Sequence, residues 1–133
     1  MATEENTASN GGLERVVGDL RALSEDMRSC AVLSADGELH ASSHAPGVDR
    51  ERAAAMLAAL RDLAERAARE NGKSHVSQVR VKTEEGHLLL VRLDSGGALA
   101  ATTGPDARVG LVLYDMRNAR GEVDKALGEG KQP

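Results

Sequence analysis

The sequence contains almost no aromatic residues: Trp and Phe are absent, and Tyr114 is the single Tyr. Ile is also absent, so Leu, Val, Met and 21 Ala residues must form the hydrophobic core. Arg outnumbers Lys by 13 to 4, a bias that a GC-rich coding sequence would produce, so the Arg content by itself indicates no function. A chain of 133 residues is the usual size of one domain and can bury roughly two-thirds of its unfolded surface.

Several classes of protein are disfavoured by what is missing. The charges are scattered, with a net charge of −4, and no basic stripe or set of stacking rings is present for a nucleic acid. No apolar run approaches the 18 residues of a membrane span. The polar N-terminus lacks the features of a secretory signal, and Cys30 has no second cysteine to pair with, so we expect a cytoplasmic protein.

Three segments have apolar residues at helical spacing. The first covers 13–27 and follows a polar segment, 1–11, that we expect to be a disordered leader. The second is the longest and runs from Asp49 to about Glu70, in the centre of the chain. The third covers 109–127, so that 128–133 is expected to be a flexible tail and 12–127 the folded domain.

Turn and capping residues separate these helices from strands. Asp36-Gly37 lies between two short apolar runs, which is a strong signal for a hairpin. Asp49 is a favourable N-cap for the central helix, Asn71-Gly72 is a typical helix end, and Asp106 is expected to cap the last helix. The predicted strands are 30–34, 38–42, 75–82, 87–93 and 98–103.

The order of elements is therefore helix, two strands, helix, three strands, helix. Consecutive strands joined by short turns pair antiparallel. We therefore predict an α/β (α+β) domain with a five-stranded, mostly antiparallel sheet, the long central helix on one face and the two terminal helices on the other.

The central helix is apolar around its whole circumference over 53–60, where the sequence reads AAAMLAAL. A helix that buries only one face does not need this pattern, so we expect burial on more than one side. The small Ala side chains would allow another backbone to come close. We infer a homodimer in which two central helices pack together, with interface residues Ala55, Met56, Ala58, Ala59 and Leu63.

The element order, with DGELHAS after the first strand and HLLLVRLDSGGALAATTGPDARVGLVLYDMR near the end, resembles the roadblock (dynein light chain) family, especially its small bacterial members. The resemblance covers about residues 12–127. It implies a roadblock/profilin-like fold and a homodimer with antiparallel central helices. It also implies that the two sheets join through the third strand, which adds Val76, Gln78 and Arg80 to the interface.

The resemblance also implies a partner, because such bacterial proteins are encoded beside small Ras-like GTPases and some promote GTP hydrolysis. The expected function is a non-catalytic regulator that modulates hydrolysis; the alternatives are a scaffold between a histidine-kinase-like sensor and a GTPase, or a profilin-like ligand sensor. The candidate GTPase contacts are Arg50, Arg52, Arg61 and Arg66. The competing interpretation is a solvated helix face with the i,i+4 pairs Arg61–Glu65 and Asp62–Arg66.

No catalytic, cofactor or metal site is expected from the motifs. GxxxxGK[ST] and GxGxxG are both absent, so the chain should bind no nucleotide by itself. His40 and His44 lack the helical HExxH context, and His75 and His87, which could face each other at strand ends, are better explained as solvated. Cys30 opens an apolar run, which favours a core thiol over a nucleophile.

Overall fold

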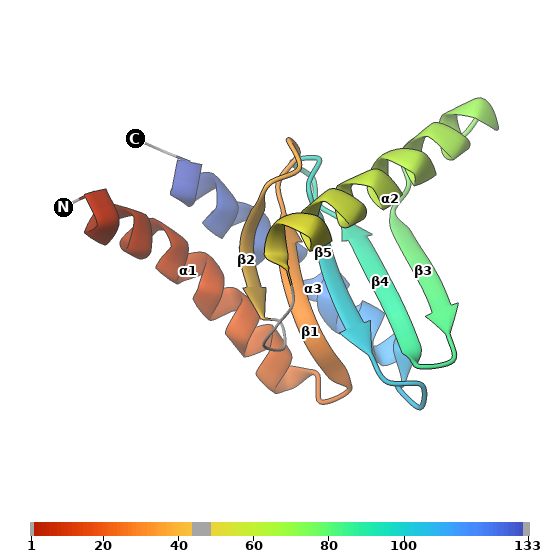
Figure 1. Cartoon of the computed structure of the whole chain (residues 1–133), viewed down its shortest axis with the longest axis horizontal. Helices are drawn as coiled ribbons and strands as arrows, with labels where there is room; N and C mark the ends of the chain where they lie inside the picture. The colour runs from red at the N-terminus through yellow and green to blue at the C-terminus, as the bar shows by residue number, and fades with distance from the viewer. Residues whose placement is uncertain (1, 44–48, 132–133) are drawn as a thin grey trace.

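A computed structural model describes residues 2–43 and 49–131, and side chains over 12–41, at 49 and over 51–129. Three helices and five strands follow one another in the order α-β-β-α-β-β-β-α, as predicted (Figure 1). The elements are α1 (Ala2–Leu23), β1 (Met27–Leu33), β2 (Leu39–Ser43), α2 (Arg50–Glu70), β3 (Gln78–Thr83), β4 (Gly86–Arg92), β5 (Ala98–Thr103) and α3 (Val109–Lys131).

The five strands form one antiparallel sheet in the order β2-β1-β5-β4-β3. Strands β2 and β3 are its edges, and α2 connects them by crossing one face of the sheet. Helices α1 and α3 lie side by side on the other face. This arrangement confirms the predicted architecture.

The two faces carry cores of very different size. Among the described residues, the core under α1 and α3 contains twenty buried side chains, with Leu99 and Met116 near complete burial. The core under α2 contains seven, four of which are alanines: Ala31, Leu33, Ala54, Leu57, Leu90, Ala98 and Ala100. None of the described helices is long and apolar enough to cross a membrane.

The predicted turn and caps around the first hairpin and α2 are confirmed. Strands β1 and β2 pair on either side of Asp36-Gly37, and Gly37 has a φ of 88°, a conformation that favours glycine. The Asp49 side chain accepts the N–H of Arg52 at 3.2 Å and caps α2. At the other end, Asn71 is the C-cap residue.

Met27 and Asp106 do not have the roles predicted for them. Met27 belongs to β1 rather than to the first helix, because the chain turns after Leu23 and the Met27 N–H bonds to the Ser24 carbonyl. The N–H of Arg108, just before α3, is accepted by Asp26 at 2.9 Å and not by Asp106. Asp26 also binds the Arg108 guanidinium at 3.0 Å, which joins the α1–β1 turn to the start of α3.

The terminal helices are longer than their apolar stripes indicated. Helix α1 begins at Ala2, so it includes residues 2–11, and α3 continues to Lys131. A helix that packing already holds extends at little cost, because each further residue adds a hydrogen bond without a new nucleation step. The proposed limits of the folded domain at 12 and 127 remain predictions.

Candidate interaction surface

Helix α2 has one face on the sheet and one face toward solvent. Ala54 and Leu57 are buried in the small core under the helix. Met56 and Leu63 point the other way and are 65% and 64% exposed. The all-round apolar pattern of the sequence therefore corresponds to one buried side and one uncovered apolar side within a single chain.

The uncovered side forms a continuous stripe at helical spacing. Ala55 and Ala59 are exposed beside Met56 and Leu63, whereas Ala58 is half-buried toward the small core. Exposed cationic side chains stand at the two ends of the stripe. We call these exposed residues the α2 surface: Arg52, Ala55, Met56, Ala59, Leu63 and Arg66.

The candidate arginines differ in what they contact. Arg61 turns inward, is only 14% exposed and donates from Nη1 to the Ser34 carbonyl at 2.9 Å. Its Nε donates to Asp62 at 3.1 Å, and Arg66 pairs with Glu70 at 3.6 Å. The alternative pairs Arg61–Glu65 and Asp62–Arg66 were therefore wrong. The Arg50 side chain lies outside the described residues.

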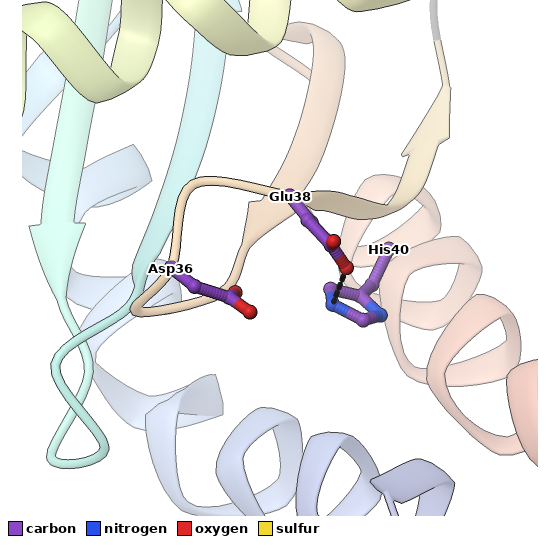
Figure 2. A group of neighbouring side chains, drawn as sticks. All are labelled: Asp36, Glu38 and His40. Carbon is purple, nitrogen blue, oxygen red and sulfur yellow. Dashed lines mark ion pairs between the residues drawn. The ribbon is translucent and has the colours of Figure 1, made fainter.

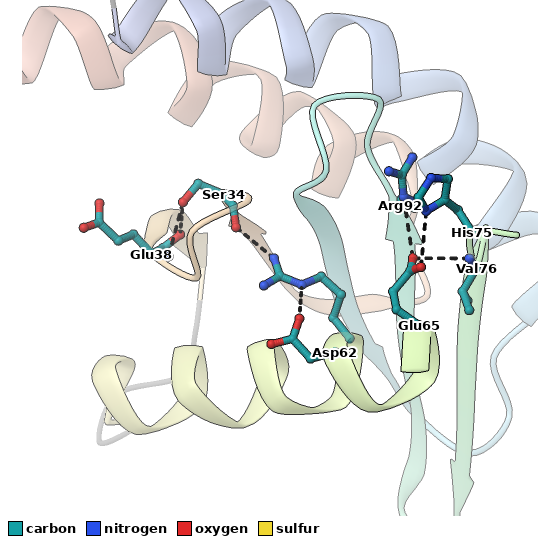
Figure 3. A network of polar contacts seen from close by, with 8 residues as sticks. Ser34, Glu38, Asp62, Glu65, His75, Val76 and Arg92 are labelled. Carbon is teal, nitrogen blue, oxygen red and sulfur yellow. Dashed lines mark hydrogen bonds and ion pairs between the residues drawn. The ribbon is translucent and has the colours of Figure 1, made fainter. Parts of the chain in front are cut away.

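Glu65 anchors the second half of α2 to the sheet (Figure 3). Its carboxylate accepts the N–H of Val76 at 3.2 Å and lies 3.6 Å from the Arg92 guanidinium on β4. His75 Nδ1 is 3.4 Å from the same carboxylate. Together with the Arg61 bond to Ser34, these contacts hold α2 across the sheet and fix which side of the helix faces solvent.

The third strand is an edge strand, and it begins at Gln78 rather than at the predicted residue 75. Val76 precedes the strand because its N–H bonds to Glu65. Gln78 and Arg80 pair with Val91 and Leu89, and so they lie on the face covered by α3. The outer backbone groups of β3 pair with no other strand among the described residues.

A groove of about 470 Å³ adjoins the α2 surface. It lies between the first half of α2 and the sheet, and Met56 contributes to both. The groove is lined mainly by aliphatic side chains and contains no aromatic residue. Its lining residues are Arg28, Ser29, Ala31, Ala53, Met56, Leu57, Leu88, Ala100, Ala101 and Thr102.

The histidine pair His75 and His87 and the single cysteine were the other candidates from the sequence. His75 contacts Glu65 before β3, whereas His87 pairs with Lys82 at the opposite end of the β3–β4 ladder, so these two histidines do not face each other as suggested. His44 lies outside the described residues. Cys30 is fully buried, which confirms the core thiol, and burial raises the pKa of this thiol to about 12.

Comparison with known families decides the classification. A model of the Roadblock/LC7 domain matches residues 15–103, from α1 to the end of β5. The chain belongs to the Roadblock/LC7 family. This match confirms the resemblance drawn from the sequence.

Relatives of this Roadblock/LC7 chain include an uncharacterized protein of Methanocaldococcus jannaschii, 30% identical over 112 residues, which are 84% of this chain and 92% of the relative. A Roadblock/LC7 domain from Streptomyces avermitilis has a TM-score of 0.77 at 23% identity, covering 86% of this chain and 96% of that chain. MglB of Myxococcus xanthus has a TM-score of 0.76 at 18% identity, covering 98% and 95%. At these identities the two structures support the fold.

Proposed function

We propose that this Roadblock/LC7 chain is a cytoplasmic, non-catalytic homodimer that binds a small Ras-like GTPase and modulates its GTP hydrolysis. The observation that carries the proposal is the α2 surface, on which Met56 and Leu63 are exposed between Arg52 and Arg66. A Roadblock/LC7 domain with such a surface is suited to binding other proteins rather than to holding a substrate.

The dimer is supported by the self-complementary character of this stripe. In a twofold arrangement each copy contributes the same residues, so Met56 of one helix meets the apolar stripe of the other. Ala55 and Ala59 leave room for two helices to approach closely. The charges at the ends remain at the rim, where water still solvates them.

The edge strand offers a second contact in the same assembly. Strand β3 has a free backbone edge, and an antiparallel partner strand would satisfy those N–H and C=O groups. The interface on this side consists of that edge together with Val76, Gln78 and Arg80. Arg80 is exposed, and Gln78 accepts a hydrogen bond from Arg117 at 3.4 Å, so these side chains flank the edge on the α3 side.

The GTPase would dock against the paired α2 helices and meet Arg52 and Arg66. Both side chains are exposed, whereas Arg61 is already bound to Ser34. A cation supplied in trans can stabilise the charge that develops on the transferring phosphoryl group, and a regulator can also act by ordering the GTPase's own residues. The second mode requires no reacting group on this chain.

A turnover assay tests this function. A Ras-like GTPase from the same cell, identified by co-purification, is measured for phosphate release with and without the chain, and we expect acceleration of at least tenfold. Arg52→Ala and Arg66→Ala should reduce the effect, whereas Arg15→Ala, an exposed arginine on α1, should not. Binding without acceleration would support the scaffold alternative, and absence of binding would refute the proposal.

A further inference from the structure

Three potential metal ligands converge at the β1–β2 turn, beside the first half of α2. Asp36, Glu38 and His40 alternate along the chain, and each offers one ligand atom within 4.8 Å of the others (Figure 2). Asp36 and Glu38 are exposed, and the His40 side chain is 25% exposed. The turn therefore brings two carboxylates and an imidazole to one small volume.

The imidazole of His40 has an unusual environment. Its Nε2 atom is shielded from solvent and makes no hydrogen bond. The Glu38 Oε2 atom lies 3.8 Å away, which is beyond hydrogen-bond reach. A shielded polar atom without a hydrogen-bond partner is rare in folded proteins and calls for an explanation such as a bound ion.

The spacing suits an ion between the ligands. Imidazole nitrogen and carboxylate oxygen bind Zn²⁺ at about 2.0–2.2 Å, so tetrahedral ligands lie roughly 3.4 Å apart. The separation of 3.8 Å between His40 and Glu38 is close to this value. Because both carboxylates are exposed at the surface, rotations of their side chains would close the remaining gap, which is at most about 1.4 Å within the 4.8 Å cluster.

The buried residue Ser34 forms hydrogen bonds with two residues of the cluster. Ser34 is fully buried, and its hydroxyl donates to the Asp36 carboxylate. The same hydroxyl accepts the N–H of Glu38 at 3.2 Å. Outer residues that orient ligating carboxylates in this way typically raise metal affinity 10- to 100-fold.

We propose that Asp36, Glu38 and His40 form a binding site for a divalent transition-metal ion of the Zn²⁺ type. The imidazole distinguishes this donor set from the all-oxygen sites of Ca²⁺ and Mg²⁺. Three protein ligands leave the fourth position for a water molecule or for a donor from another molecule. The site is independent of the proposed function in GTPase regulation.

Titration of the chelator-treated full chain with ZnSO₄ in a calorimeter tests the site. We expect one ion per chain with micromolar affinity. His40→Gln and Asp36→Asn should each weaken binding at least tenfold, and Asn-Gly preserves the hairpin turn. The control is His87→Gln, a histidine on β4 at the far end of the β3–β4 ladder, which should bind as the wild type does.

Amide and imidazole NMR spectra provide a second readout that does not depend on the stability of a variant. Addition of Zn²⁺ should shift resonances of residues 34–41 in the wild-type chain. Absence of saturable binding below 1 mM (roughly −4 kcal/mol by the standard conversion) would overturn the proposal. So would equal affinity in the wild type and both ligand variants, or shifts centred on His75 or His87.

Discussion

Leu63→Ala should weaken the proposed dimer without weakening the monomer. Leu63 is 64% exposed in the single chain, so about two-thirds of its side chain remains to be buried by a partner. Full burial of a Leu side chain contributes about 1.5–3 kcal/mol, which leaves about 1–2 kcal/mol per copy. A twofold interface contains two copies, so the loss is about 2–4 kcal/mol, or roughly a 30- to 700-fold increase in the dimer Kd.

Sedimentation equilibrium over a range of concentrations measures this change. Interference optics are suitable because the chain has no Trp and a single Tyr. Leu23→Ala is the matched control, since Leu23 is 68% exposed on α1 and lies outside the α2 surface. If both variants shift the Kd equally, or if the wild type is monomeric at micromolar concentration, the assignment of the α2 surface to the dimer is wrong.

Two further predictions concern groups whose pKa the fold changes. Because burial raises the pKa of Cys30 to about 12, a thiol reagent at pH 8 should label the native chain roughly 1,000-fold more slowly than the urea-unfolded chain; rates within tenfold of each other would contradict this. The N–H and guanidinium of Arg108 lower the pKa of Asp26 below its ordinary 3.8. Asp26→Asn should therefore reduce the free energy of unfolding at pH 7. The difference from wild type should vanish as the pH falls through the folded-state pKa of Asp26. If urea titrations show that the difference persists below this pH, the ionised Asp26 carboxylate is not its cause.

The sheet and its helices were predictable because local signals agreed with the tertiary structure. Asp36-Gly37 specified a hairpin, and Asp49 and Asn71 marked the ends of α2. The apolar segment 53–60 predicted two apolar sides of one helix, and the structure has both. In each case the residues determine the conformation of the segment in which they lie, so the sequence of that segment is enough to predict it.

The errors arose where a long-range contact determined the local structure. Asp26 accepts the N–H of Arg108, 82 residues away, and no spacing in the sequence indicates that capping partner. The start of β3 was likewise set by Glu65, whose carboxylate takes the N–H of Val76. Both carboxylates looked like ordinary surface charges in the sequence.

The candidate sites also contain contacts that the sequence did not predict. The inward turn of Arg61 depends on the Ser34 carbonyl, 27 residues earlier, and was not foreseen. The convergence of Asp36, Glu38 and His40 was also not predicted, because no known metal-binding motif has this spacing of two carboxylates and one histidine. The alternation of these residues across a predicted hairpin turn was the signal that could have found it.

The thin, alanine-rich core beneath α2 has a consequence for local opening of the molecule. Its buried side chains are three leucines, Leu33, Leu57 and Leu90, and four alanines among the described residues, whereas α1 and α3 share a much larger core. The loss of α2 from the sheet therefore exposes less apolar surface than the loss of either terminal helix, and its amide hydrogens should exchange with solvent first. A second chain bound to α2 would slow that exchange, so association and the local folding of this helix would be thermodynamically linked.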